Sequence, residues 1–398
     1  MSCHLMTFTA HSTNNPFKRG ASAPNRQHLA VELMIDKSII ERIVDSYDPK
    51  NISIGAIGSH SALDIADGAK DEGFRTVIVC QEGREKPYLF YKRIVDEVIV
   101  LKRFSDIIRP EVQKQLRDKN TIFVPHRSFT TYVDYESIEN RFEVPIFGNR
   151  MILRAEERSA PINQYHVLER AGIRYPKVFN SPDEIDRPVI VKVHEAKRRI
   201  ERAFFVASSA SDFYAKARER VEKGIIAEED VAAAKIEEFI IGTYFNFNYF
   251  YSPTLDRVEF LGIDRRLQTD LFDYVTLPAR QQLEINIPLQ NIEIGHTPAT
   301  IRESMLEKVF ELGERFVKAT KEMFPPGIIG PFALQSAVTK DLEIVVYDVS
   351  PRVPGSPIIS TTSPYTKYLF GHSVSTGRRI AMEIKRAIEF GRLKDVVT

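Results

Sequence analysis

The chain has 398 residues, of which 43% are hydrophobic and 27% are charged, a composition that excludes a disordered or fibrous protein. At about 100–200 residues per domain, this length predicts two or three domains. With 55 Lys and Arg against 54 Asp and Glu, the formal net charge is +1, which argues against nucleic-acid and anionic-membrane binding. Two cysteines, Cys3 and Cys80, are too few for a disulfide framework and indicate a cytoplasmic protein. No segment reaches the roughly 18 apolar residues that cross a bilayer.

The N-terminal segment over residues 1–33 is predicted to be a disordered tail. It contains TNNPFKRGASAPNRQH, which has neither a continuous apolar stretch nor a regular hydrophobic period. From Met34 onward the sequence places Ile35, Ile39, Ile40, Ile43 and Val44 at helical spacing. We therefore expect the folded body to begin at Met34, which is also a candidate for the natural start.

Alternating strand and helix signals fill residues 34–149. A buried strand after Pro49, a tight turn at Gly58-Ser59 and an apolar-faced helix form a strand–turn–helix unit. Four further strands are expected at 76–80, 95–101, 121–125 and 144–148. This alternation predicts a parallel, Rossmann-like sheet over about residues 50–150. The first strand is not followed by G-x-G-x-x-G, so a dinucleotide site is not supported.

The remaining chain divides into two α/β segments, 150–242 and 243–398. The first is expected to hold a helix over 163–173, strands over 187–193 and 204–207, two helices after residue 208, and the strand IEEFIIG. The second is richer in strands, namely FNFNYFYS, RVEFLGID, FALQSAVT and LEIVVYDVS, and ends in the helix GRRIAMEIKRAIEFG.

Two loops of the first domain are candidates for ligand binding. Residues 58–61, Gly-Ser-His-Ser, lie between a strand and a helix, where free N–H groups favour an anion. On the motif alone, capping of the helix by Ser59 or Ser61 is the favoured alternative, but His60 adds a ligand hydrogen-bonding group. The second loop, 125–129, is expected at the same sheet edge, where such sheets bind ligands. Taken singly, its His126 and Arg127 are favoured as a solvated loop pair.

Two candidates for phosphate and adenine binding lie in the second segment. Lys192 ends the strand VIVK, so its ammonium can project toward a polyphosphate, although a strand-end lysine is usually solvated. The loop 194–202 that follows is rich in cations, which suit phosphates, but an exposed charge run is favoured for it. Residues 237–241 form a predicted strand edge whose backbone could pair with an adenine rim, the alternative being a plain strand.

The last candidates lie on two successive strands near the C-terminus. Gln335 and Asp348 could be set side by side by a hairpin-like connection, and their oxygens suit Mg²⁺. Two ordinary strand residues are an equally favoured interpretation. Arg352 is a candidate phosphate clamp because a guanidinium matches phosphate oxygens with two hydrogen bonds, the alternative being a surface arginine.

Several strings together resemble a known family. They are GSHSALDIADGAKDEGF, FGNRMILRAEERS, VIVKV, IEEFIIGTYF, LGIDRR, EMFPPGIIGPFALQ, YDVSPRV and STGRRIAMEIKRAI. In unbroken order over about residues 34–398, they resemble the archaeal formate-dependent purine-biosynthesis ligases of the ATP-grasp superfamily, the 5-formaminoimidazole-4-carboxamide ribonucleotide synthetases. The resemblance implies an α/β fold with a Rossmann-like pre-ATP-grasp domain followed by a two-lobed ATP-grasp domain. It also implies a trimer or hexamer.

The resemblance implies a reaction in which ATP, formate and 5-aminoimidazole-4-carboxamide ribonucleotide (AICAR) give the formylated nucleotide (FAICAR), ADP and phosphate. Formyl phosphate is the implied intermediate, and no protein nucleophile is required. The implied roles fall into three groups: substrate binding by His60, Ser128 and His296; ATP binding by Lys192, Glu237, Glu238, Phe239, Ile240 and Gln268; and Mg²⁺ binding, with Mn²⁺ as an alternative, by Gln335 and Asp348.

The sequence departs from the family pattern at four places. The glycine-rich loop expected after VIVK is replaced by HEAKRRIER, Gln268 stands at an expected glutamate, His296 stands at an expected asparagine, and Pro354 and Pro357 lie in an expected glycine-rich segment. Two interpretations follow: an active ligase whose basic loop substitutes for glycine amides, or a diverged paralogue with lost or altered activity, including a non-catalytic partner subunit.

Overall fold

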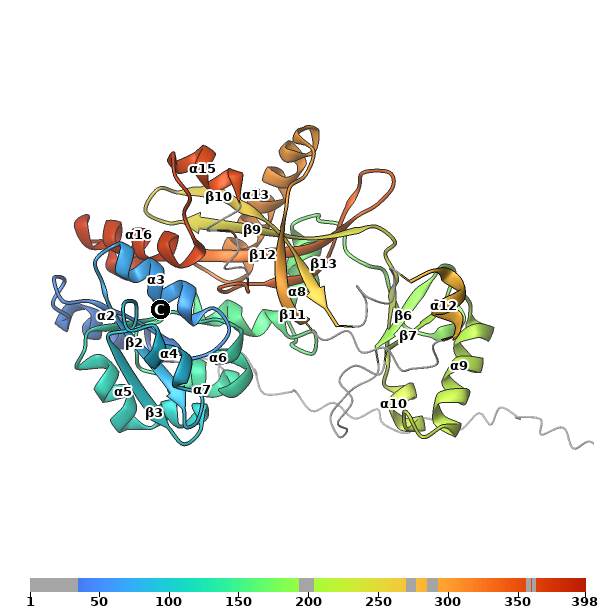
Figure 1. Ribbon diagram of the computed structural model, residues 1–398, viewed down its shortest axis with the longest axis horizontal. Coiled ribbons are helices and arrows are strands. Elements are labelled where there is room, and N and C mark those ends of the chain that lie inside the picture. The colour runs from blue at the N-terminus through green and yellow to red at the C-terminus, as the bar shows by residue number, and fades with distance from the viewer. Residues whose placement is uncertain (1–34, 193–203, 270–276, 285–292, 356–358, 360–362) are drawn as a thin grey trace, which may run out of the picture. The chain divides into compact units, whose positions relative to one another are not determined.

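The computed structural model describes residues 35–192, 204–269, 277–284, 293–355, 359 and 363–398 (Figure 1). The tail expected over residues 1–33 and the basic loop 194–202 lie outside the described residues. No helix in the described part of the chain is long and apolar enough to cross a membrane.

The first sheet has four parallel strands in the order β3-β2-β1-β4, which confirms the predicted parallel arrangement. Every residue of β1 is buried, as the apolar run predicts for a central parallel strand. The strands are β1 Ser53–Ile57, β2 Arg75–Gln81, β3 Glu97–Leu101 and β4 Thr121–Phe123. The helices around them are α2 Lys37–Ser46, α3 Ala62–Asp71, α4 Lys86–Phe90, α5 Pro110–Arg117, α6 Arg127–Tyr132 and α7 Tyr135–Asn140.

The strand predicted over 144–148 is wrong. The segment makes a single parallel bridge to β4, between Phe123 and Ile146. The Phe123 N–H donates to the Pro145 carbonyl oxygen and the Phe147 N–H donates to the Phe123 carbonyl oxygen, both over 2.8 Å, while Ile146 exchanges hydrogen bonds of 2.9 Å with Thr398 on its other side. The segment therefore lies beside β4 but pairs with it at one residue only, which is too short for a strand.

The second sheet is antiparallel, in the order β5-β8-β6-β7. Its strands are β5 Val178–Phe179, β6 Val189–Lys192, β7 Phe204–Ala207 and β8 Lys235–Glu238. The nearby helices are α8 Gln164–Arg170, α9 Ala210–Glu222 and α10 Glu228–Ala232. The predicted strand IEEFIIG is too long at its C-terminal end, because β8 stops at Glu238, where the chain leaves the ladder.

The third sheet has five antiparallel strands in the order β11-β10-β9-β12-β13. Its strands are β9 Thr243–Ser252, β10 Arg257–Gln268, β11 Glu293–Ala299, β12 Gly330–Val338 and β13 Ile344–Ser350. The sequence patterns did not predict β11 or the helix α13 Leu306–Met323, which buries Val309, Leu312 and Phe316 against this sheet. The remaining helices are α12 Ala279–Glu284, α15 Pro364–Phe370 and α16 Thr376–Glu389.

Helix α16 packs directly on α3 of the first sheet's layer (Figure 1). The contact depends on glycine: a Cβ at Gly68 would lie 2.0 Å from the backbone of Arg378, and one at Gly377 would lie 2.1 Å from the carbonyl oxygen of Asp64. The carboxylate of Asp64 also accepts a 2.9 Å hydrogen bond from the Gly377 N–H. The C-terminal helix thus completes the core beside β1 and the turn that follows it.

Candidate active site

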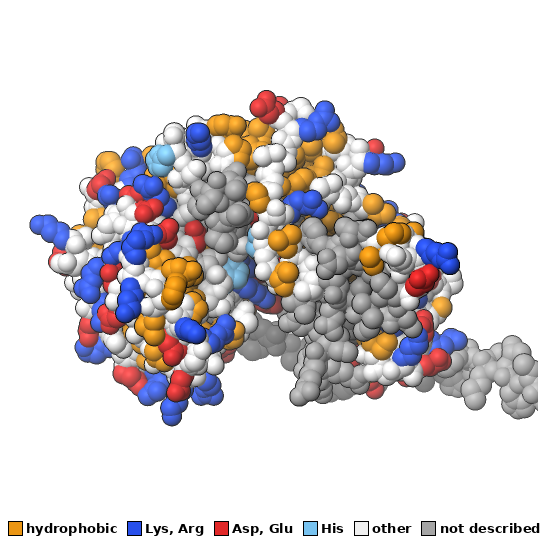
Figure 2. Space-filling view, viewed as in Figure 1, with side chains coloured by type: hydrophobic (Ala, Val, Ile, Leu, Met, Phe, Trp, Pro, Cys, Tyr) orange, Lys and Arg blue, Asp and Glu red, His pale blue; other side chains and the backbone are white. Residues whose placement is uncertain are grey.

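A cavity of about 760 Å³ is lined by residues of the second and third sheets and by His60 and Arg127, which follow β1 and β4 of the first sheet. Histidine and basic side chains gather in a hollow on the face shown in Figure 2. The lining includes most of the side chains that the sequence suggested, namely His60, Lys192, Glu237, Glu238, Phe239, Ile240, His296, Gln335, Asp348 and Arg352. Segments that are up to 290 residues apart in the chain therefore open into one space.

Two of the predicted residues do not line the cavity. Ser128 is 8% exposed and is the second residue of α6, where its backbone N–H donates to His126 Nδ1 over 3.2 Å. Gln268 ends β10 and lies opposite Glu293 in the register with β11.

Lys192 and Glu237 form an ion pair on the wall formed by the second sheet. The Lys192 ammonium bonds to Glu237 Oε2, which also accepts a 3.0 Å hydrogen bond from the Tyr165 hydroxyl. Burial lowers the pKa of Lys192, against the opposing effect of the Glu237 carboxylate. The solvated alternative for Lys192 is wrong, since its side chain is only 17% exposed.

The predicted strand edge at 237–241 needs correction. β8 is an inner strand, and Glu237 pairs with Val178 of β5 on one side and Ile190 of β6 on the other. Sheet partners flank Glu237 on both sides, so it faces the cavity through its carboxylate instead. Phe239 and Ile240, which follow the strand, line the cavity.

Gln335 and Asp348 are direct register partners on β12 and β13, as the hairpin hypothesis predicted. Gln335 is 3% exposed, and its Nε2 donates to Ser350 Oγ over 3.2 Å while its Oε1 has no hydrogen-bond partner. A buried oxygen without a partner beside a carboxylate suits a hard cation. Among the described residues, no group of three or more His, Cys, Asp or Glu could hold a metal ion. In such a site, phosphate or water oxygens would complete the coordination of the cation.

Asp348 is held by two residues that the residue patterns did not single out. Gln164 donates to Asp348 Oδ1 over 3.0 Å and accepts a 2.5 Å hydrogen bond from the Val349 N–H. The Arg158 guanidinium lies 3.7 Å from Asp348 and 3.8 Å from Glu237, so that it links the metal candidate to the lysine pair.

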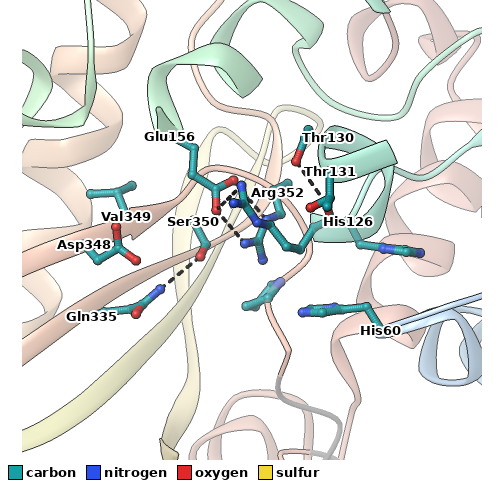
Figure 3. A network of polar contacts seen from close by, with 12 residues as sticks. His60, His126, Thr130, Thr131, Glu156, Gln335, Asp348, Val349, Ser350 and Arg352 are labelled. Carbon is teal, nitrogen blue, oxygen red and sulfur yellow. Dashed lines mark hydrogen bonds and ion pairs between the residues drawn. The ribbon is translucent and has the colours of Figure 1, made fainter. Parts of the chain in front are cut away.

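Arg352, the expected phosphate clamp, is buried and paired rather than at the surface (Figure 3). Its Nη2 and Nε bond to the two oxygens of Glu156 at 2.6 and 3.2 Å. Arg127 lies 3.4 Å from the same carboxylate and 3.4 Å from that of Glu157. Two guanidiniums therefore face two carboxylates on this wall, so their formal charges balance.

The two loops of the first domain meet through a pair of stacked imidazoles. The rings of His60 and His126 lie 5.6 Å apart with an interplanar angle of 12°. The solvated interpretation of His126 is wrong: it is 0% exposed, and its Nε2 lies 2.8 Å from the Ile57 carbonyl oxygen. Burial lowers the pKa of His126 to about 4. Side-chain capping by Ser61 is also wrong, because its hydroxyl donates to the Pro354 carbonyl oxygen over 2.8 Å.

His296 is held between two carboxylates. Its Nδ1 lies 2.6 Å from Asp264 Oδ2, and its Nε2 lies 3.0 Å from Glu293 Oε1. Burial opposes the charged ring, but the hydrogen bonds to these carboxylates outweigh it and raise the pKa of His296 to about 9. Asn246 and Asn248 each donate to Asp264 over 2.7 Å, which fixes that carboxylate.

Sequence patterns missed several of these residues as site residues. Glu156, Arg158 and Asp264 lie inside strings that carried the family resemblance, FGNRMILRAEERS and LGIDRR, and this was the available signal. Gln164 lies on a predicted helix, where nothing distinguishes it from a surface residue. Glu293 lies on an unpredicted strand.

Comparison with solved structures identifies the class of protein. A crystal structure of an IMP biosynthesis protein PurP from Thermococcus kodakaraensis is 31% identical, with a TM-score of 0.67 over 87% of this chain and 100% of that chain. The ADP complex of an N5-carboxyaminoimidazole ribonucleotide synthetase, at 14% identity and a TM-score of 0.55, shares the fold over 81% of this chain and 77% of that chain. The chain is an ATP-grasp ligase with a Rossmann-like domain before the ATP-grasp lobes.

Sequence relatives then identify the family. Proteins from Methanopyrus kandleri and Methanocaldococcus jannaschii are 45% and 44% identical over 92% of this chain and 100% of each relative. Both are named 5-formaminoimidazole-4-carboxamide-1-(beta)-D-ribofuranosyl 5'-monophosphate synthetase. The chain belongs to this family, which confirms the resemblance. Two family models, a protein of unknown function (DUF1246) and a domain of unknown function (DUF1297), match residues 54–179 and 212–398.

Proposed function

We propose that this chain formylates AICAR to FAICAR in IMP biosynthesis, consuming ATP and formate and releasing ADP and phosphate. The supporting observation is that Lys192, the Gln335–Asp348 pair and His60 all open into one cavity. A phosphate donor and an acceptor nucleotide can then react without leaving the protein. The proposed reaction is also the one that the name of the Methanopyrus kandleri relative describes.

The proposed chemistry explains why the cavity needs positioned charges rather than a nucleophile. The oxygen of formate is a poor leaving group, so formate must first take a phosphoryl group from ATP to become formyl phosphate. The amine of AICAR then attacks the formyl carbon, the carbon–oxygen bond to phosphate breaks, and phosphate leaves with that electron pair. Phosphoryl transfer of this kind depends on positioning and charge neutralisation, roles that suit Lys192 and Arg352.

Gln335 and Asp348 would hold Mg²⁺, or Mn²⁺ as the alternative, and the cation would supply charge neutralisation for phosphate oxygens. The amide oxygen of Gln335 and the carboxylate of Asp348 provide one formal negative charge. Arg158 and Gln164 keep the carboxylate oriented toward the amide.

The proposed residue roles depend on where each side chain lies relative to the cavity. Phe239 and Ile240 would meet the adenine, with Glu238 beside them, and His60 and His296 would lie on the AICAR side. Ser128 and Gln268 do not line the cavity, so they would act through the elements that contain them, α6 and β10. The proposed domains are residues 34–149, 150–242 and 243–398, and each contains one sheet.

We also propose that the protein is cytoplasmic and that it assembles as a trimer or a hexamer.

The test is turnover with every substrate omitted in turn. Purified protein with ATP, Mg²⁺, formate and AICAR should release ADP and FAICAR, and omission of any one should stop both. Nucleotide binding without ADP release under the full conditions would contradict the proposal and favour a diverged paralogue.

Two variants test the assigned ends of the cavity separately. Asp348→Asn should remove Mg²⁺-dependent ATP binding and leave AICAR binding unchanged, whereas His60→Ala should weaken AICAR binding and leave ATP binding unchanged. Asp118→Asn, at an exposed surface pair with Lys114, is the matched control. Unchanged ATP affinity in Asp348→Asn would contradict the metal assignment.

A further inference from the structure

The turn between β1 and α3 holds His60 through two linked hydrogen bonds. His60 Nδ1 lies 2.8 Å from Ser61 Oγ, and Ser61 Oγ lies 2.8 Å from the carbonyl oxygen of Pro354. Ser61 occupies the N-cap position of α3, yet its side chain makes no capping hydrogen bond. It is 3% exposed, so water does not compete freely for its hydroxyl.

These contacts determine which nitrogen of His60 carries the proton. A hydroxyl has one proton to donate, and a carbonyl oxygen can only accept. Two oxygens 2.8 Å apart repel each other unless a proton lies between them, so Ser61 donates to Pro354. Ser61 Oγ must then accept from His60, and this requires the proton on Nδ1. In the neutral ring, Nε2 is left as an unprotonated acceptor.

The surroundings keep the ring neutral and fix its plane. His60 keeps an exposed surface, but the protein atoms that surround its ring lower its pKa, and the positive charge of Arg352 lowers it further. The stacked ring of His126 is itself held at both nitrogens, by the Ile57 carbonyl oxygen and the Ser128 N–H. His60 thus meets the cavity as a neutral ring in a fixed orientation.

Gly355 leaves the acceptor nitrogen accessible. A Cβ at this position would lie 3.0 Å from both Cε1 and Nε2 of His60. Figure 3 shows the His60 ring pointing into the network around Arg352 and Glu156. Any side chain at residue 355 would crowd the nitrogen that faces the ligand space.

We propose that Ser61 is a positioning residue that holds His60 in the Nδ1–H tautomer, so that Nε2 accepts a hydrogen bond from an N–H donor of the bound nucleotide. The donor is an amine or carboxamide N–H of the aminoimidazole base. The identity of this ligand rests on the proposed function, whereas the tautomer does not.

The first test needs no nucleotide. ¹⁵N NMR of histidine-labelled protein reports which ring nitrogen is protonated, and His60→Gln identifies the His60 signals among the nine histidines. We expect a protonated Nδ1 and an unprotonated Nε2 in the unchanged protein, with a shift toward the Nε2–H form in Ser61→Ala. Ser53→Ala is the matched control, because this buried hydroxyl also donates to a carbonyl oxygen, that of Lys119, and does not line the cavity. An Nε2–H ring in the unchanged protein would overturn the proposal whether or not Ser61→Ala folds.

The second test measures nucleotide affinity by calorimetry. Ser61→Ala should bind AICAR about three- to tenfold more weakly, the usual effect of one neutral hydrogen bond. The ATP affinity of Ser61→Ala, and both affinities of the control Ser53→Ala, should stay unchanged. Gly355→Ala should also weaken AICAR binding by crowding Nε2.

Two analogues identify the donor: one nucleotide lacks the amine and the other lacks the carboxamide. The analogue whose affinity does not respond to Ser61→Ala lacks the group that bonds to His60. If Ser61→Ala lowered the affinity for both analogues equally, the proposal would be overturned, since neither the amine nor the carboxamide would then be the partner of His60. Failure of the unchanged protein to bind all three nucleotides would overturn the proposed function alone, because NMR decides the role of Ser61 independently.

Discussion

Gln164 shows how a single buried amide can determine the geometry of the proposed metal site. It is 2% exposed, and its side chain bonds to Asp348, to the Val349 N–H and to the Glu156 carbonyl oxygen. The last two contacts tie β13 to the segment that carries Arg158. Residues that orient metal-binding carboxylates commonly affect metal affinity about 10- to 100-fold.

We therefore predict that Gln164→Ala weakens Mn²⁺ binding in the presence of ATP by about tenfold or more. It should also lower the free energy of unfolding by about 1–3 kcal/mol, because the Val349 N–H loses its partner. Gln113→Ala is the matched control: this buried amide bonds two carbonyl oxygens and one N–H in the first domain, away from the cavity. Metal titrations followed by electron paramagnetic resonance would check the affinities, and an equal loss in both variants would contradict the positioning role.

His296 gives a prediction about pH. Its pKa is raised from the ordinary value of 6.5 to about 9, so the charged ring is favoured in the folded state. The stabilisation is complete below pH 6.5 and is lost as the pH rises through about 9. At roughly 1.4 kcal/mol per pKa unit, the contribution is at most about 3–4 kcal/mol.

Urea unfolding between pH 6 and 10 would measure this effect by comparing the unchanged protein with His296→Asn. The difference in unfolding free energy between the two should shrink above pH 8, because only the unchanged protein loses the imidazolium. A difference that is independent of pH would contradict the assignment.

At the scale of elements, α16 is attached to the third sheet by a buried ion network. Arg379 is 2% exposed and bonds to Glu259 of β10 and to Glu383 on its own helix. Glu383 in turn accepts from Ser252 Oγ at the end of β9 over 2.7 Å. The same helix packs on α3, so the network links the third sheet to the layer that carries His60.

Arg379→Met should lower the free energy of unfolding by about 3–5 kcal/mol, since it leaves the buried carboxylate of Glu383 without a cation and that of Glu259 with Arg257 alone. Arg378→Met, which removes a partly exposed pair with Glu72, should cost about 1 kcal/mol or less. Chemical denaturation of both variants would check this, and similar costs for the two would count against a structural role for the buried network.

At the scale of the whole molecule, the cavity takes its walls from the second sheet, from the third sheet and from the segments that follow β1 and β4 of the first sheet. A ligand pair that fills it should therefore protect backbone amides in every one of them. With AICAR and a non-hydrolysable ATP analogue, each at about 100 times its dissociation constant, each ligand should add about 2.7 kcal/mol to the stability.

Hydrogen exchange should show slower exchange around residues 57–62, 235–240 and 333–350 when both ligands are bound. AICAR alone should protect mainly the first of these segments, because His60 lies there, and the ATP analogue alone should protect the other two. Protection confined to a single sheet with both ligands bound would contradict a shared cavity.

The sequence by itself determined the local structure and the family. Periodic apolar residues predicted α2 and α16, continuous apolar runs predicted β1 and β2, and spacing alone suggested that Gln335 and Asp348 are neighbours. These features depend on residues close together in the chain, where hydrophobic period and turn chemistry act directly. The sequence strings, taken in their order along the chain, were sufficient to identify the ATP-grasp family.

Only the tertiary structure decided how the site residues are held. Nothing near Ser61 in the sequence indicates that its hydroxyl bonds to Pro354. Nor does the sequence indicate that the segment 144–148 bonds to β4 on one side and to the C-terminal residues on the other. Burial and hydrogen-bond partners of His126, Arg352 and Lys192 likewise come from segments far away in the chain. Such partners are set by packing of whole sheets and helices, which no local pattern encodes.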